Sequence, residues 1–456
     1  MNFDLVIKNG RVVNADADFI ADVAIQGERI AAIGEELSGT TEVDATGCWV
    51  TPGAVDAHVH MQMTLPTGIT SADDFTTGTR AAAFGGTTTI IDFVECDRDE
   101  HMLHALERRR AQADPQVMID YGLHMTIGPD EMTKLKQVSD AIYAGCVSFK
   151  LYMAYGFYLD DGQLLRALQA IHEWGGLPVV HAENWSVIRT LVAQYVEAGR
   201  TAPVNHAKTR PAALEAEAAG CIIDLAAYVG TPLHIFHVGC QEVVERIVAA
   251  QAKGLPVTGE TCPQYLTLTD SLYEQEGIQA ALPVCAPPLR TEADQAAMWQ
   301  ALATGQLQIV TTDHCPFTIQ DKQRGIDAND FSQIPGGVPS IEIRFPLIYS
   351  LGVTGGHLTK NQWIDVCCTR PAQMFGLQQK GIIAPGYDAD IVIFDPKAEW
   401  KVSPDTLHEN CDWTPYANLS LRGKPISTFV RGAPVVENNK LVGQPGQGRF
   451  IVRDIG

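Results

Sequence analysis

The sequence lacks the features of a membrane, secreted or nucleic-acid-binding protein. No run approaches the ~20 apolar residues of a membrane-spanning helix, and the start, MNFDLVIKNG, has no basic segment followed by an apolar one. Its 33 basic residues are outnumbered by 54 acidic ones. This balance argues against binding to nucleic acid, which requires a basic patch that neutralises phosphates. We therefore predict a cytoplasmic protein that acts on a small neutral or polar molecule, with no nucleic-acid partner and no membrane association.

Cysteine clusters, phosphate-binding loops and repeats are also missing. The 11 cysteines are dispersed, none is spaced as CxxC, and only Cys367 and Cys368 are adjacent. This distribution indicates neither a disulfide framework nor a thiolate zinc site. No glycine-rich loop stands between a strand and a helix, and no repeat or low-complexity tract is visible. Since 46% of the 456 residues are hydrophobic, the chain is expected to fold around a large core.

The two ends of the chain read as β-hairpins. Short alternating apolar stretches occupy residues 3–9, 11–13, 22–26 and 29–33. They are joined by the turn signals Asn9-Gly10 and Gly27-Glu28. The segments ADIVIFDP, STFVRGAPVV and KLVG are similar short apolar stretches near the C-terminal end. Two strand sets so far apart in sequence can complete one small β-sandwich.

The middle of the chain reads as strands alternating with helices. Segments such as LLRALQAIHEW and VVERIVAAQAKG have the 3.6-residue spacing of a helix with one buried face. Eight apolar strand candidates lie at about 47–60, 86–93, 117–124, 146–152, 177–183, 232–238, 255–261 and 307–313. Eight strand-helix units predict a (β/α)₈ barrel of the TIM type. We assign residues 53–375 to this barrel and residues 1–52 with 376–456 to the β-sandwich domain.

Residues that can bind metal close several of these apolar runs. They are His58, His60, Lys150, His181, His237 and Asp313. In a parallel barrel the carboxyl ends of all strands open onto one face, so ligands distant in sequence converge there. Two imidazoles at positions i and i+2 of a strand point the same way and can hold one ion. Imidazole and carboxylate ligands without thiolates favour zinc, with manganese or cobalt as substitutes. The pattern predicts a metallohydrolase.

Each of these residues also has a purely structural interpretation. Lys150 follows an apolar run, where burial lowers the pKa of an amine and lets it take up carbon dioxide as a carbamate that bridges two metals. The alternative is a lysine that reaches solvent or forms an internal salt bridge. His181 and His237 can be hydrogen-bonded core residues, and Asp313 can be a helix cap or turn residue. Asp56 is available to support the histidines from behind.

Several motifs together resemble one enzyme family. They are GAVDAHVH, FGGTTTIIDF, SFKLYMAY, VVHAEN, ETCPQYL, TTDHCPF and PGYDADIVIFDP. The chain resembles the cyclic amidohydrolases of the amidohydrolase superfamily, in the hydantoinase and dihydropyrimidinase branch, over essentially its whole length. This resemblance implies a metal-bearing barrel with a small β-sandwich from both termini. It also implies ring opening of hydantoins or dihydropyrimidines to N-carbamoyl amino acids, by a homotetramer or homodimer.

The resemblance implies a role for each metal-binding candidate. His58 and His60 would hold the more buried of two divalent metals, most simply zinc. His181 and His237 would hold the more exposed one. A carbamylated Lys150, that is N6-carboxylysine, would bridge the two.

The resemblance also implies the catalytic roles. A metal-bridging hydroxide would attack the ring carbonyl, while Asp313 binds the buried metal, accepts the hydroxide proton and passes it to the leaving nitrogen. Tyr155 would donate a hydrogen bond to the developing oxyanion. The alternative for Tyr155 is an aromatic residue that only packs at the barrel mouth.

The substrate pocket departs from the usual family pattern. Ala286 in CAPPLR and Gly336 in IPGGVPSIE replace polar residues that flank the cyclic amide in the family, so main-chain contacts would remain and side-chain contacts would not. Leu65 and Tyr152, with the segment Phe157 to Leu159, offer an apolar enclosure for a ring substituent or else close the barrel rim. We therefore expect broad selectivity.

Two alternative functions share these features. An allantoinase has the same metals and a different pocket, and Ala286 is compatible with it. A non-catalytic dihydropyrimidinase-related interaction protein keeps the fold without the ligands, but here all six ligand candidates and Tyr155 are retained.

Other polar residues are expected to be structural. These are His124, His234 and His314. His206 is expected on a surface connection that can approach the barrel mouth, and the run from Glu107 to Arg110 is expected on a solvated helix face.

Overall fold

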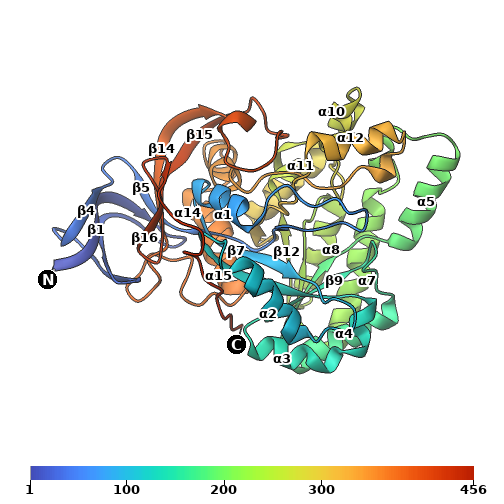
Figure 1. Ribbon diagram of the computed structural model, residues 1–456, viewed down its shortest axis with the longest axis horizontal. Coiled ribbons are helices and arrows are strands. Elements are labelled where there is room, and N and C mark those ends of the chain that lie inside the picture. The colour runs from blue at the N-terminus through green and yellow to red at the C-terminus, as the bar shows by residue number, and fades with distance from the viewer. Residues whose placement is uncertain (1, 456) are drawn as a thin grey trace.

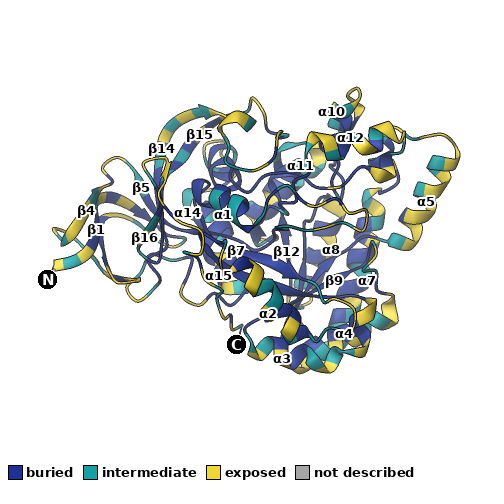
Figure 2. Ribbon diagram, in the orientation of Figure 1, coloured by how far each residue is buried: buried dark blue, intermediate teal, exposed yellow. Residues whose placement is uncertain are grey.

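The computed structural model describes residues 2–455, which form a strand-rich lobe and a larger α/β lobe (Figure 1). The strand-rich lobe combines the first strands of the chain with strands from its C-terminal part, blue and red in Figure 1. Buried residues concentrate in the strands of the larger lobe, while its peripheral helices carry their exposed residues on the outside (Figure 2). Among the described residues, no helix is long and apolar enough to cross a membrane.

The larger lobe is the predicted parallel barrel. Its strands pair in chain order and are β6 (Ala54–Asp56), β7 (Thr87–Val94), β8 (Asp120–Ile127), β9 (Ser148–Tyr152), β10 (Leu177–His181), β11 (Leu233–Ile235), β12 (Val257–Thr261) and β13 (Ile309–Val310). A parallel bridge between Val59 and His314 links the segments that follow β6 and β13, which brings the first and last strands together. Every residue of β7 and β8 is buried, as expected for strands covered on both faces. The (β/α)₈ prediction is confirmed.

Helices cover the outside of the barrel. Capping residues start several of them, and one apolar face of the helix packs against the strands. In α4 the carboxylate of Asp160 accepts a hydrogen bond from the main-chain N–H of Gln163, and the buried residues recur at helical spacing. The α-helices are α1 (Phe75–Phe84), α2 (Met102–Ala113), α3 (Val138–Tyr143), α4 (Asp161–Glu173), α5 (Trp185–Glu197), α6 (Asn205–Lys208), α7 (Ala212–Val229), α8 (Gln241–Gln251), α9 (Pro263–Thr267), α10 (Ile278–Ala281), α11 (Glu292–Ala303), α12 (Ile319–Asp327), α13 (Arg344–Leu347), α14 (Lys360–Ile364) and α15 (Arg370–Met374). Short 3₁₀ or π segments are Pro129–Thr133, Leu135–Gln137, Asp270–Glu274, Phe331–Gln333, Ile348–Val353, Asp365–Thr369 and Pro404–Thr406.

The smaller lobe is a mixed sheet built from both ends of the chain, as predicted. Its strands are β1 (Asn2–Val13), β2 (Asp18–Gln26), β3 (Arg29–Gly34), β4 (Ser38–Asp44), β5 (Trp49–Pro52), β14 (Ile391–Lys401), β15 (Ser420–Val430), β16 (Ala433–Glu437) and β17 (Lys440–Leu441). The two ends meet where β5 pairs antiparallel with β14, with Val50 opposite Ile393. We propose the domain limits given above, because β5 ends at Pro52 in this sheet and β6 starts at Ala54 in the barrel.

The turn predicted at Asn9-Gly10 is wrong. β1 continues through this point, where its register against β2 shifts between Ile7 and Gly10 and Asn9 has a φ of 61°. The first half of β1 pairs with β4 and its second half with β5, so this irregularity lies where the sheet forks. A Cβ at Gly10 would stand 2.3 Å from Val50 Cγ2, which explains the glycine. The turn predicted at Gly27-Glu28 joins β2 to β3, as expected.

The predicted strand at 47–60 is also divided. It contains β5, in the smaller lobe, and β6, in the barrel. A continuous apolar pattern cannot reveal that a chain passes from one sheet to another, since both sheets bury these residues.

The C-terminal segment lies against the start of β8, at the end of the barrel opposite the strand carboxyl ends. The main-chain N–H of Tyr121 donates to the carbonyl of Arg449 at 2.9 Å, and that of Ile451 donates to the carbonyl of Tyr121 at 2.8 Å. The buried guanidinium of Arg453 donates to Ser148 Oγ at 2.9 Å. Residues 449–453 therefore close the floor of the barrel.

Candidate metal centre and active site

Two histidines and an aspartate converge at the carboxyl ends of β6 and β13. His58 Nε2 and His60 Nε2 each lie 3.1 Å from Asp313 Oδ1, and one ligand atom from each residue falls within 4.8 Å of the others. His58 and His60 thus point the same way, as their spacing predicts. Three ligands suited to a divalent cation, two imidazoles and one carboxylate, meet at one point.

The remaining two histidines extend this cluster. The rings of His181 and His237 have centroids 4.5 Å apart, and the His237 ring lies 5.4 Å from that of His58. Within residues 2–455, the buried His237 Nδ1 has no hydrogen-bond partner, and the only contact of the buried His58 Nε2 is with Asp313 Oδ1 at 3.1 Å. A buried polar atom without a partner is costly, so His237 Nδ1 fits metal coordination better than a purely structural role. The donor set of imidazoles and carboxylate is one that zinc accepts.

Lys150 is buried among aromatic rings beside this cluster. Its side chain is 1% exposed, and Nζ lies 4.2 Å from the ring centroid of Phe236 and 4.8 Å from that of Tyr152. Burial lowers the pKa of Lys150 to about 7, although Asp313 acts in the opposite direction. The burial excludes a solvent-reaching lysine, and among the described residues no ion pair involves Lys150. The amine is therefore partly neutral near pH 7, the form that reacts with carbon dioxide.

Sequence reasoning missed the carboxylates that hold these histidines from behind. Glu260 Oε1 lies 2.6 Å from His58 Nδ1, and Glu260 Oε2 lies 3.2 Å from His234 Nε2. Burial disfavours the Glu260 carboxylate, but these histidines outweigh it and lower its pKa to about 2. Glu183 Oε2 similarly lies 2.8 Å from His181 Nε2. The available signal was a glutamate inside or just after an apolar strand, in VTGET and VVHAEN.

Asp56 supports the loop that carries Asp313. Its carboxylate accepts hydrogen bonds from the main-chain N–H and the hydroxyl of Thr312, at 3.1 and 2.7 Å. Arg344 Nε lies 3.6 Å from Asp56 Oδ2 in an interior without exposure of either side chain. Asp56 thus fixes the residue that precedes Asp313.

Three of the candidate residues have left-handed backbone conformations. The φ angles are 65° at Tyr155, 40° at His237 and 51° at Asp313. Such values are uncommon outside glycine and cost free energy, so the surrounding structure must hold them in place. This strain fits a site in which the direction of the side chains is fixed at the expense of a low-energy backbone conformation.

Tyr155 lies beside the histidines rather than apart from them. Its ring centroid is 5.3 Å from that of His181 and 5.2 Å from the guanidinium carbon of Arg210. Burial raises the pKa of the Tyr155 hydroxyl, so it stays protonated and able to donate a hydrogen bond at neutral pH. This location is compatible with oxyanion stabilisation.

The residues expected to flank the ring line a common cavity. Tyr155, Ala286 and Gly336 border a space of about 540 Å³. His206 also lines it, and the expectation that it lies on the surface is wrong, because it is 8% exposed and its Nε2 lies 2.8 Å from the carbonyl oxygen of Cys285.

The residues expected around the substituent are partly elsewhere. Tyr152 is buried, with its ring centroid 5.3 Å from that of Phe157 and 6.0 Å from that of His181. Leu65 packs against a small apolar cluster that contains Ile69 and Phe317. Tyr152 therefore lies next to the metal-binding candidate His181, while Leu65 lies apart in the loop after β6.

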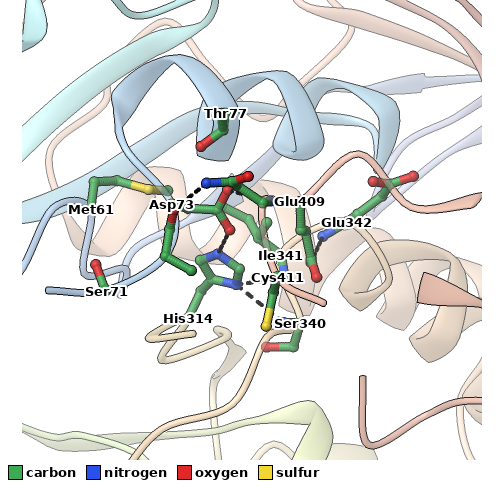
Figure 3. Close-up of polar contacts among 12 residues, drawn as sticks. Met61, Ser71, Asp73, Thr77, His314, Ser340, Ile341, Glu342, Glu409 and Cys411 are labelled. Atoms are coloured by element: carbon green, nitrogen blue, oxygen red, sulfur yellow. Dashed lines mark hydrogen bonds and ion pairs between the residues drawn. The ribbon is translucent and has the colours of Figure 1, made fainter. Parts of the chain in front are cut away.

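The three histidines expected to be structural have internal partners. His124 lies 2.7 Å from Ser148 Oγ through Nδ1, and His234 lies 2.8 Å from Thr258 Oγ1. His314 Nε2 lies 3.0 Å from Asp73 Oδ2, while its Nδ1 accepts the main-chain N–H of Ser340 (Figure 3). His314 thus ties the segment after Asp313 to the loop before α1.

The prediction of a solvated run from Glu107 to Arg110 holds for Glu107, which is exposed, and is wrong for the arginines, which are only partly exposed. Arg109 is only partly exposed and donates to Asp92 Oδ2 and, at 3.1 Å, to the carbonyl of Phe93. Arg108 Nε donates to Glu100 Oε1 at 2.9 Å. These side chains turn back towards the end of β7, a direction that sequence spacing on one helix does not specify.

Known proteins match the chain over nearly its full length. A model of the amidohydrolase family matches residues 49–435. The chain belongs to the amidohydrolase family. It is 44% identical over 454 residues to a D-hydantoinase of Geobacillus stearothermophilus, covering 98% of this chain and 96% of that protein.

Solved structures place the chain in the same branch of the amidohydrolases. A D-hydantoinase from a Bacillus species superposes with a TM-score of 0.96 at 43% identity, with 99% of each chain covered. A dihydropyrimidinase from Brevibacillus agri gives a TM-score of 0.96 at 41% identity, with 98% of each chain covered. The resemblance read from the motifs is confirmed: this amidohydrolase belongs with the hydantoinases and dihydropyrimidinases.

Proposed function

We propose that this chain hydrolyses the ring of hydantoins or dihydropyrimidines to N-carbamoyl amino acids. The main support for this reaction is the convergence of His58, His60 and Asp313 at the barrel mouth, next to the buried Lys150. The D-hydantoinases that match the chain over nearly all of its length support this reaction class.

The residues at the mouth suit two divalent cations. His58, His60 and Asp313 would hold one ion, His181 and His237 the other, and a carbamate on Lys150 would be shared. Zinc fits these donors best, with manganese or cobalt as substitutes. When bound, such ions lower the pKa of coordinated water and polarise a carbonyl oxygen.

Asp313 and Tyr155 carry the protein's own part of the reaction. The Asp313 carboxylate, kept ionised by the adjacent histidines against the cost of burial, accepts the proton of the attacking water and returns it to the leaving ring nitrogen. The Tyr155 hydroxyl donates a hydrogen bond to the oxygen on which negative charge develops. The cavity beside Tyr155 holds the ring against the main chain at Ala286 and Gly336.

The function is tested by comparing hydantoin, dihydrouracil, 5-substituted hydantoins and allantoin as substrates of the purified chain. We expect ring opening of the first three classes, about two divalent ions per chain by elemental analysis, and loss of activity on chelation. Full activity without metal would contradict the metal centre. Allantoin as by far the best substrate, with substituted hydantoins untouched, would replace this proposal with an allantoinase.

The carbamate has its own test. A crystal structure of the metal-loaded chain should show Lys150 extended by a carboxyl group, and Lys150→Ala should lose most activity, with partial rescue by short carboxylic acids. An unmodified lysine in an active, metal-loaded site would contradict it. We further propose a cytoplasmic homotetramer or homodimer, which sedimentation equilibrium distinguishes from a monomer.

A further inference from the structure

A second cavity opens beside the metal centre, separate from the one that contains Tyr155. It measures about 570 Å³ and is lined by the loop after β6, the end of β7 and one face of α2. His60 forms part of its wall, and the His60 ring stacks on Phe93 with centroids 4.5 Å apart. The cavity therefore extends outward from a candidate metal ligand.

The lining of this cavity is charged, and all but one of its charged groups have ionic partners. Its carboxylates are Asp92, Glu95 and Asp97, and its guanidiniums are Arg108 and Arg109. Arg109 is paired with Asp92, and Arg108 lies 3.5 Å from Asp97. Within residues 2–455, the Glu95 carboxylate takes part in no hydrogen bond or ion pair, while its main-chain carbonyl accepts from Arg108 at 2.8 Å.

The position of Glu95 directs this free carboxylate to the barrel mouth. Glu95 immediately follows β7, which ends at Val94 among the strand ends that carry the metal-binding candidates. Its side chain is mostly buried, and this burial raises the pKa of Glu95 to about 7 despite the nearby Arg109. A partly buried carboxylate without a partner is unfavourable, and a cation that donates hydrogen bonds would compensate it.

We propose that Glu95 makes this cavity a subsite for ring substituents that end in an ammonium or guanidinium group. The assignment rests on the proposed ring-opening function and refines its substrate class. A ring held at the metal centre can extend a substituent past His60, so that the terminal N–H groups reach the Glu95 carboxylate. The expectation of a purely apolar substituent pocket is thereby modified, because this wall offers an acceptor.

The test compares two substrates of similar length that differ in charge. These are 5-(4-aminobutyl)hydantoin, whose side chain ends in an ammonium, and 5-pentylhydantoin, whose side chain ends in a methyl group. We expect wild-type kcat/KM to favour the aminobutyl compound, and Glu95→Gln to reduce this ratio about tenfold, since a charge-assisted hydrogen bond becomes a neutral one. The exposed Glu107 lies on α2 outside the cavity lining, and Glu107→Gln should leave the ratio unchanged.

Each other outcome is decisive. An unchanged ratio in Glu95→Gln overturns the subsite, including the case in which both rates fall together because the fold is damaged. An equal loss of the ratio in Glu107→Gln also overturns it, since the effect would then be long-range. If the wild type also fails to open unsubstituted hydantoin and dihydrouracil, the proposed function itself has failed, which unsubstituted substrates reveal independently of Glu95.

Discussion

Glu260 holds His58 through a 2.6 Å contact between its Oε1 and the imidazole Nδ1. A carboxylate at Nδ1 favours the tautomer in which Nδ1 carries the proton, and this leaves the lone pair of Nε2 free. Nε2 is the atom that faces Asp313. The two residues are 202 positions apart in sequence, so this pair exists only through closure of the barrel.

Glu260→Gln should weaken metal binding while leaving the fold intact. Loss of the negative charge behind the ligand is expected to reduce metal affinity or activity ~10–100-fold. Metal content after dialysis against a weak chelator measures the effect. Glu342→Gln is the matched control, because Glu342 contacts His408, which is no metal candidate. Equal metal retention in both variants would contradict the role of Glu260.

Asp313→Asn should nearly abolish turnover. The amide keeps the size of the side chain but cannot accept a proton, and loss of such a group typically reduces the rate ~10²–10⁴-fold. Steady-state kcat, with metal content measured on the same sample, separates proton transfer from ligand loss. Asp224→Asn, at an exposed position of α7, should behave as wild type. A kcat within a few-fold of wild type would remove Asp313 from proton transfer.

Tyr155→Phe removes only a hydroxyl group. If this hydroxyl stabilises the oxyanion, kcat should fall ~10²–10³-fold while metal content stays constant. Tyr143→Phe, with a side chain 78% exposed, provides the control for the chemical change. An unchanged kcat would leave packing as the only role of Tyr155.

Gly336→Asn should narrow the ring cavity without disturbing the backbone. A Cβ at Gly336 would lie 3.8 Å from Cys285 Cα, an ordinary contact, so the variant is expected to fold. The ratio of kcat/KM for 5-alkyl hydantoins to that for dihydrouracil should then decrease severalfold, as shape discrimination in a pocket is modest at ~1–3 kcal/mol. Gly337→Ala is expected to be destabilised instead, because its φ is 144° and a Cβ would stand 2.2 Å from the carbonyl oxygen of Cys315. A ratio unchanged in a folded Gly336→Asn variant would place the substrate elsewhere.

Lys322 should make stability depend on pH. It is fully buried, and Nζ donates to the carbonyl oxygens of Val284 and Gly337 at 2.8 Å each, which matches the two N–H groups of a neutral amine. Burial lowers its pKa from 10.5 to about 7, so between these values the unfolded chain binds the proton and the folded chain does not. The contribution of Lys322 to stability therefore rises with pH across this window and is constant below it.

The test of Lys322 is a pair of thermal melts at about pH 7 and pH 9.5. The Tm of the wild type minus the Tm of Lys322→Met should be larger at about pH 9.5 than at about pH 7, because only the wild type carries the contribution of Lys322. Lys253→Met, at an exposed position, should show no such trend. A difference independent of pH would mean that Lys322 is charged in the folded protein.

The sequence was sufficient for the barrel and for the elements that carry the site. Each apolar run is a local signal, and the rule that parallel strand ends converge places His58 and Asp313 together without further information. The bulge at Asn9-Gly10 was not foreseen, because an Asn-Gly pair favours a tight turn and a left-handed bulge for the same conformational reason.

The partners of the site residues were the harder part. Glu260 and Glu183 act through side-chain hydrogen bonds to histidines, and nothing in local spacing indicates which acceptor faces which nitrogen. The direction of Arg109 depends on the groups at the end of β7, which its own helix does not specify. Such choices are made by packing between distant segments.

The placement of residues 449–453 on the barrel floor affects how the protein is made. During synthesis the metal-binding segments leave the ribosome before residues 449–453. The main-chain N–H and carbonyl of Tyr121 in β8 therefore lack these hydrogen-bond partners until Arg449 and Ile451 have been made. The barrel can therefore be finished only after translation has passed these residues. A nascent chain halted before them would present an open barrel floor, the kind of exposed apolar surface on which chaperones act.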